Sequence, residues 1–140
     1  MDIKNILSSI YELNKKINYL KGEEFYYREL SLSVQSVRYD QESTNPNKNI
    51  VAPFVRYLEK AERIKDKINE LEKERSEKMI ELEEFISLLT SHEDRMILRY
   101  RYIVLMTWDE IANKMHYSKR HTLRRHEQAI EKLKMSLNVT

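Results

Sequence analysis

Apolar residues recur every three or four positions through most of this chain, which is the spacing of one face of an α-helix. In the N-terminal segment these positions are Ile3, Ile6, Ile10, Leu13, Ile17 and Leu20. The 140 residues include only one glycine and two prolines. Because β-hairpins and phosphate-binding loops need glycine at fixed turn positions, both are disfavoured. The sequence therefore predicts an all-α fold.

A second periodic segment begins near Ile50 and has lysine and glutamate between its apolar positions, as in a coiled coil. Its apolar positions are Leu58, Ala61, Ile64, Ile68, Leu71, Met79, Leu82, Ile86 and Leu89, with Arg75 in the same seam. Serine, asparagine and proline interrupt the pattern over residues 31–49, which predicts a loop after a first helix over 2–30. We expect residues 1–89 to form a long helical hairpin, although a parallel dimer uses the same spacing.

This N-terminal hairpin has two readings. It is a spacer, or it is an arm for oligomerisation or partner binding, through which the chain forms a homodimer. Tyr26 and Tyr27 are expected to pack inside it.

The last fifty residues predict three helices with clear start signals. Thr90 with Glu93, and Thr107 with Glu110, have the spacing of capping boxes, and Ser118 is a third cap. A short helix over 108–115, a brief turn and a longer helix over 118–135 make a helix-turn-helix arrangement. The inward face of the last helix is expected to use Thr122, Leu123, Ala129, Ile130, Leu133 and Leu137. Residues 90–140 are thus a candidate DNA-binding module.

Basic residues gather where such a module needs them. Residues 91–140 carry 10 Lys and Arg against 6 Asp and Glu, and residues 111–126 contain no acid. The second helix of a helix-turn-helix presents its N-terminal residues to the major groove. We expect base contacts from Arg120, Arg124 and Gln128, because guanidinium and amide groups match base edges. Phosphate contacts are expected from Lys119, His121 and Arg125, with Ser118 at the turn.

This region resembles region 4 of sigma-70-type factors. It is more similar still to sigma-like regulators of phages and prophages of low-GC Gram-positive bacteria, the RinA/ArpU-type late-transcription regulators. The matching segments are LRYRY (98–102), TWDEIA (107–112) and KMHYSKRHTLRRHEQAI (114–130), and more loosely SVQSVRYD (33–40). The motif carries over to the turn (Tyr117, Ser118) and to Arg120, Arg124 and Arg125 of the recognition helix.

The resemblance implies a sequence-specific double-stranded DNA-binding regulator of phage late genes that contacts RNA polymerase. Since no segment resembles region 2 of a full sigma factor, a self-sufficient sigma factor is disfavoured. One alternative is a small-terminase-like DNA-packaging protein, in which the order of modules is usually reversed. The other is a coiled-coil adaptor that binds RNA polymerase without touching DNA.

Other kinds of site find little support in the sequence. The chain has no cysteine, and the histidines at 116, 121 and 126 do not share one helix face, so a metal site is disfavoured. No nucleophile, base and acid form a recognisable constellation, so we expect neither an enzyme nor a cofactor. His126 and Trp108 are expected to be packing residues. With no long apolar run, the expected location is the cytoplasm of a bacterial host cell.

Overall fold

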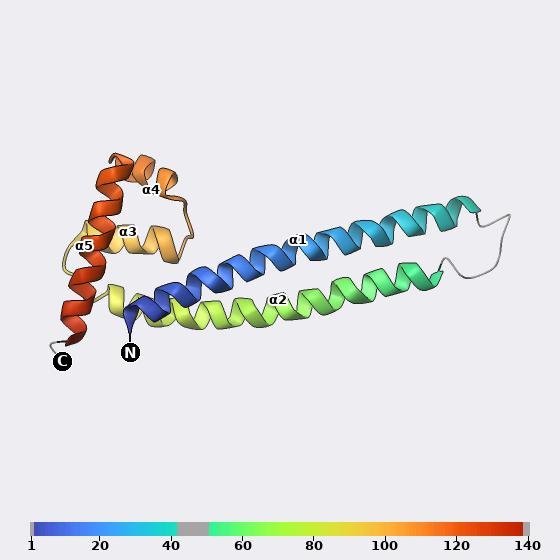
Figure 1. Cartoon of the computed structure of the whole chain (residues 1–140), viewed down its shortest axis with the longest axis horizontal. Helices are drawn as coiled ribbons and strands as arrows, with labels where there is room; N and C mark the ends of the chain where they lie inside the picture. The colour runs from blue at the N-terminus through green and yellow to red at the C-terminus, as the bar shows by residue number, and fades with distance from the viewer. Residues whose placement is uncertain (1, 42–50, 139–140) are drawn as a thin grey trace. The chain divides into compact units, whose positions relative to one another are not determined.

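The computed structural model describes residues 2–41 and 51–138, and these form five helices without a strand (Figure 1). The helices are α1 (Ile3–Gln41), α2 (Val51–Ile86), α3 (His92–Tyr102), α4 (Trp108–Met115) and α5 (Lys119–Asn138). The predicted all-α architecture, with a helical hairpin before a three-helix module, is confirmed.

The chain packs as two units. One, called the core unit here, contains residues 1–12 and 74–140; the other, the hairpin unit, contains residues 13–73. The helices α1 and α2 each contribute to both units. The functional division into residues 1–89 and 90–140 remains a prediction.

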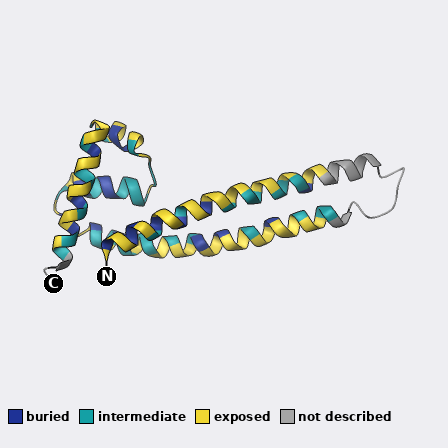
Figure 2. Cartoon of the chain, in the orientation of Figure 1, coloured by how far each residue is buried: buried dark blue, intermediate teal, exposed yellow. Residues whose placement is uncertain are grey.

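In the core unit, the two ends of the chain share one hydrophobic cluster (Figure 2). The start of α1 contributes Ile3, Ile6, Leu7 and Ile10; the end of α2 and the residues after it contribute Leu82, Ile86 and Leu89; α3 and α5 contribute Leu98, Ala129 and Leu133. Burying one such large aliphatic side chain stabilises a fold by roughly 1.5–3 kcal/mol. The three C-terminal helices therefore depend on the start of α1 for a complete core.

In the hairpin unit, α1 packs against α2 of the same chain. Leu13 and Ile17 of α1 form a buried cluster with Ile68 and Leu71 of α2. Farther along, Arg28 bonds both Glu24 and Glu62, at 2.9 Å and 3.0 Å. Of the two alternatives that the spacing allows, the structure therefore has the intrachain hairpin.

The paired tyrosines in this unit behave differently from each other. Tyr27 stacks on Tyr57 with ring centroids 6.3 Å apart, and the Lys60 ammonium lies 4.6 Å from the Tyr27 ring centre. Tyr26 only meets the edge of Tyr27 and is 57% exposed. The expectation of hairpin packing is confirmed for Tyr27 and wrong for Tyr26.

The first helix is longer than its sequence predicts. It continues to Gln41, so the expected loop over 31–49 is wrong for residues 31–41, and residues 42–49 lie outside the described residues. Serine was read as a loop signal, but the Ser31 hydroxyl donates to the Arg28 carbonyl at 2.7 Å inside the helix. This internal bond allows serine to lie within a continuing helix.

Two of the three predicted caps are confirmed. Thr107 Oγ1 accepts from the Glu110 amide at 3.2 Å, and Ser118 Oγ accepts from the His121 amide at 3.1 Å. The third cap is one residue later than expected, because Ser91 rather than Thr90 begins α3 and accepts from the Asp94 amide. This shift places Asp94 in the first turn of α3.

Candidate nucleic-acid interface

A tight turn joins α4 to α5 and fixes their mutual orientation. His116 adopts the left-handed conformation (φ 60°, ψ 38°), and the Tyr117 amide donates to the Ala112 carbonyl at 3.0 Å. These bonds satisfy the last carbonyls of α4, as in a Schellman-type ending. Ser118 then caps α5 directly. The arrangement of α4, turn and α5 is that of a helix-turn-helix.

The inward face of α5 differs in one place from the expected one. Thr122, Ala129 and Leu133 are fully buried, and Thr122 donates its hydroxyl to the Ser118 carbonyl at 2.9 Å. Leu123 is 38% exposed, so its assignment to the inward face was wrong. The inward stripe runs through the buried positions 122, 129 and 133 and the half-buried position 126, and residue 123 lies to one side of it. The prediction for Leu137 concerns a side chain that lies outside the described ones.

Three of the predicted contact residues share an exposed strip of α5. Arg120, Arg124 and Gln128 are all exposed and lie four residues apart, so they follow one side of the helix. In the described part of the chain, neither Arg120 nor Arg124 takes part in an ion pair of 4.0 Å or less. We call Arg120, Arg124 and Gln128 the exposed strip. It offers two guanidinium groups and one amide to a neighbouring molecule.

The other predicted contact residues around the turn have intramolecular partners. Lys119 lies 3.6 Å from Asp109, but both side chains are well exposed, so the pair is a weak surface contact. His121 is half-buried with its ring edge-on to Tyr117 at 4.5 Å. Ser118 is exposed and serves as the helix cap. Lys119 and His121 thus flank the start of the exposed strip.

Arg125 points away from the exposed strip and into a charged network. Its Nε donates to Asp94 Oδ1 at 2.9 Å and one terminal nitrogen donates to Ser91 Oγ at 3.1 Å. Lys132 donates to the second oxygen of Asp94 at 2.7 Å. The carboxylate itself is fully buried. These contacts connect the first turn of α3 to two positions of α5 that lie about two turns apart.

The protonation of Asp94 follows from its surroundings. Burial alone would raise the pKa of this carboxyl, since a charge is poorly solvated away from water. The hydrogen bonds from Lys132 and Arg125 outweigh burial, so the pKa of Asp94 is lowered. Asp94 is therefore ionised near neutral pH and holds both cations. Sequence reasoning missed this network, because its members are separated by 31 and 38 residues.

An aromatic group lies on the other side of α5. The Arg101 guanidinium lies 4.3 Å from the Trp108 ring centre, and His126 meets Trp108 edge-on at 4.7 Å. The Tyr102 hydroxyl and His126 Nε2 share a hydrogen bond of 2.7 Å. Trp108 and His126 are therefore packing residues, as predicted. Arg101 also donates to the Met106 carbonyl at 3.1 Å, and Arg99 pairs with Glu83 at 2.9 Å.

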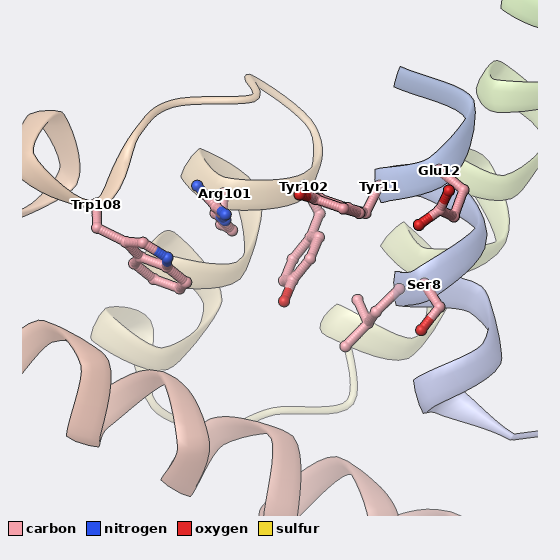
Figure 3. Close-up of a pocket in the computed structure, with 7 residues that line it drawn as sticks. Ser8, Tyr11, Glu12, Arg101, Tyr102 and Trp108 are labelled. Carbon is pink, nitrogen blue, oxygen red and sulfur yellow. The ribbon is translucent and has the colours of Figure 1, made fainter. Parts of the chain in front are cut away.

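A pocket of about 220 Å³ opens beside this aromatic group (Figure 3). It is lined by Leu7, Ser8, Tyr11, Glu12, Arg101, Tyr102 and Trp108. Its volume is below the range of about 300–1,000 Å³ that is usual for small-molecule sites. Among the described residues, no group of three acidic or histidine side chains could hold a metal ion. The exposed strip therefore remains the better candidate site.

The half-buried His126 predicts a pH-dependent stability. Burial, and secondarily the nearby Arg101 charge, lowers the pKa of His126 to about 4, while burial raises the pKa of Tyr102 to about 12. An unfolded chain binds a proton at its ordinary histidine pKa of about 6.5, but the folded chain does not until about pH 4. Stability should therefore be complete above pH 6.5 and fall by up to about 1.4 kcal/mol per pH unit below it.

Urea unfolding of the wild type and His126→Gln, from pH 7.5 to pH 4.5, would check this. The difference in unfolding free energy between the two proteins should shrink as the pH falls. A constant difference across this window would contradict a buried neutral His126.

Comparisons with known proteins agree with the geometry of the C-terminal helices. Residues 91–135 match the family described as Sigma-70, region 4. This segment spans α3, α4 and most of α5, including the turn and the exposed strip. No curated protein and no solved structure gave a significant match. Separately, no helix among the described residues is long and apolar enough to cross a membrane.

Proposed function

We propose that the sigma-70 region 4 domain at residues 91–135 makes this protein a sequence-specific, double-stranded DNA-binding transcriptional regulator of phage late genes. The observation that carries the proposal is the exposed strip on the second helix of the helix-turn-helix. In such folds this helix enters the major groove. Residues 111–126, which include Arg120 and Arg124, contain no acid, and this favours approach to a polyanion.

The chemistry of the strip supports direct base readout. Arg120 and Arg124 suit guanine, which presents two acceptors to a planar guanidinium, and Gln128 suits adenine. Lys119 and His121 flank the strip and suit phosphate oxygens. The sequence predicts that Arg125 contacts a phosphate, but we do not include this contact in the proposal, because the Arg125 guanidinium already bonds Asp94 and Ser91. It acts by holding α5 in place.

Two partners belong to this proposal. RNA polymerase is the first, by analogy with the sigma factors whose region 4 this domain matches. A second copy of the chain, joined through the N-terminal helices, is the other. The phage late-gene part of the proposal rests on the resemblance of the LRYRY, TWDEIA and KMHYSKRHTLRRHEQAI segments to phage regulators.

Selection of bound sequences from a randomised duplex pool with the purified protein tests the proposal. We expect an enriched motif, because base contacts from the strip discriminate among sequences. Affinity for that motif should fall steeply with salt, since phosphate contacts release counterions. Weak, salt-sensitive binding without enrichment would favour the packaging alternative. No DNA binding, with retention of RNA polymerase in a pull-down, would favour the adaptor alternative.

A further inference from the structure

Gly22 is the only glycine of the chain, and it lies in the interior of α1. Glycine weakens a helix interior, so its presence there calls for a reason. The described residues give none: the φ of Gly22 is not positive, and an added Cβ would meet no described atom within 4 Å. Glycine is otherwise favoured where another backbone must approach closely. The position therefore suits a contact with a second molecule.

The surface around Gly22 is unusually rich in exposed aromatic side chains. Tyr19, Phe25 and Tyr26 are 69%, 67% and 57% exposed. All three lie within about 60° of Gly22 around the helix, at about 100° per residue. Exposed positions recur along α1 in the hairpin unit (Figure 2). Clustered exposed aromatic residues are typical of an interaction surface.

This surface has its own helical seam, distinct from the buried one. Lys15, Asn18, Gly22, Phe25 and Glu29 follow a 3-4-3-4 spacing and are all exposed. The seam that packs on α2 uses Leu13, Ile17 and Leu20 instead. A helix that packs on one neighbour needs one seam. The second seam contains the exposed Phe25, with Tyr19 and Tyr26 beside it, and this apolar content favours a second helical neighbour.

Its charges identify that neighbour. Lys15 precedes Gly22 by seven residues and Glu29 follows it by seven. Among the described residues, neither side chain takes part in an ion pair. When two copies of a helix cross antiparallel about a two-fold axis, each residue before the crossing point faces the equivalent residue after it. Lys15 then faces Glu29 of the other copy, twice in one interface.

We propose that two copies of this chain dimerise through α1, antiparallel and crossing at Gly22. Tyr19 then faces Phe25 of the other copy, and Asn18 faces Tyr26. On a straight helix, two residues seven positions apart differ by about 20° in their direction around the helix axis. A left-handed crossing of the two helix axes at about 20° compensates for this difference. The small residue at the centre lets the two backbones approach, while the aromatic side chains fill the space on either side.

Charge reversal on the full-length chain tests this, with dimerisation measured by sedimentation equilibrium without DNA. Lys15→Glu and Glu29→Lys should each weaken the dimer by about tenfold or more, because each places two like-charge pairs in the interface. The double variant should return to within about threefold of the wild type. The matched control Lys16→Glu/Glu59→Lys makes the same charge changes at exposed positions off this seam and should leave the dimer unchanged.

Substitution of Gly22 separates a dimer contact from a structural role. Gly22→Ala should raise the melting temperature of the dilute monomer, because alanine favours helix and meets no atom within the chain. At the same time it should weaken the dimer, and Gly22→Leu should weaken it further. Circular dichroism would verify that both variants fold.

Three outcomes would overturn the proposal. They are a wild type that stays monomeric at high concentration, single reversals without effect, and a double variant no better than the single ones. A parallel pair would give the second outcome, because Lys15 would face Lys15. This dimer deepens the second-copy part of the proposed function. Since no DNA is present in the experiment, failure here would remove the second copy as a partner and leave the proposed DNA binding standing.

Discussion

Asp94→Ala is expected to lower the free energy of unfolding by about 2–4 kcal/mol, the largest effect we predict for a polar residue in the core unit. The wild-type carboxylate is fully buried and accepts from Arg125 at 2.9 Å and Lys132 at 2.7 Å. Its removal leaves a small void and two cations without their shared partner. It also removes the charged link between α3 and α5.

Urea unfolding followed by the fluorescence of Trp108, the only tryptophan, would measure the loss of unfolding free energy in the unit that contains Asp94. Asp109→Ala is a matched control, because Asp109 has only a 3.6 Å surface contact with Lys119 and should change stability by about 0–1 kcal/mol. Equal stability of Asp94→Ala and the wild type would show that the network does not hold α5.

Arg124→Ala is expected to weaken binding to a selected DNA site by about 1–3 kcal/mol, which is roughly 5–150-fold in affinity. The variant should also discriminate less among bases at one base pair of that site. Arg124 is exposed on the strip, so the fold itself should keep its stability within about 0.5 kcal/mol. Fluorescence anisotropy with the selected duplex and with single-base variants of it would measure both effects.

Two further arginine substitutions serve as controls for the effect of Arg124→Ala on DNA affinity. Arg63→Ala removes an exposed arginine from α2 and should leave DNA affinity unchanged. Arg125→Ala should lower stability, because it leaves the buried Asp94 with only Lys132 as a charged partner. If Arg124→Ala lowers the affinity equally for every DNA sequence, Arg124 contacts a phosphate rather than a base. If it does not lower the affinity for any sequence, α5 is not the recognition helix.

Local features of the sequence predicted most of the DNA-binding region. The Thr107 and Ser118 caps, the apolar period and the turn between them are encoded by residues that lie close together along the chain. They were enough to position α4 and the start of α5, and with them Arg120, Arg124 and Gln128. Such features depend on hydrogen bonds to the adjacent turn, which spacing alone reveals.

The sequence-based predictions differ from the structure in two situations. In one, the same residues suit two local structures; in the other, the contacting residues lie far apart in the sequence. Ser31 is compatible with both a loop and a helix, and in the structure it lies within α1 with its hydroxyl bonded to the Arg28 carbonyl. Thr90 and Ser91 are both suitable caps, and the structure uses the second. Arg125 and Asp94 meet only after α3 and α5 have packed, so nothing near either residue in the sequence indicates their bond.

The shared cluster of the core unit also constrains the order of events during synthesis. The start of α1 leaves the ribosome long before α5, yet Ile6 and Ile10 are buried in the same cluster as Leu98 and Leu133. The nascent chain must keep this apolar segment available until its partners emerge, and closure over such a sequence distance slows folding. Substitutions at Ile6 or Ile10 will therefore change how many newly made chains reach the folded state, without altering any residue of the exposed strip.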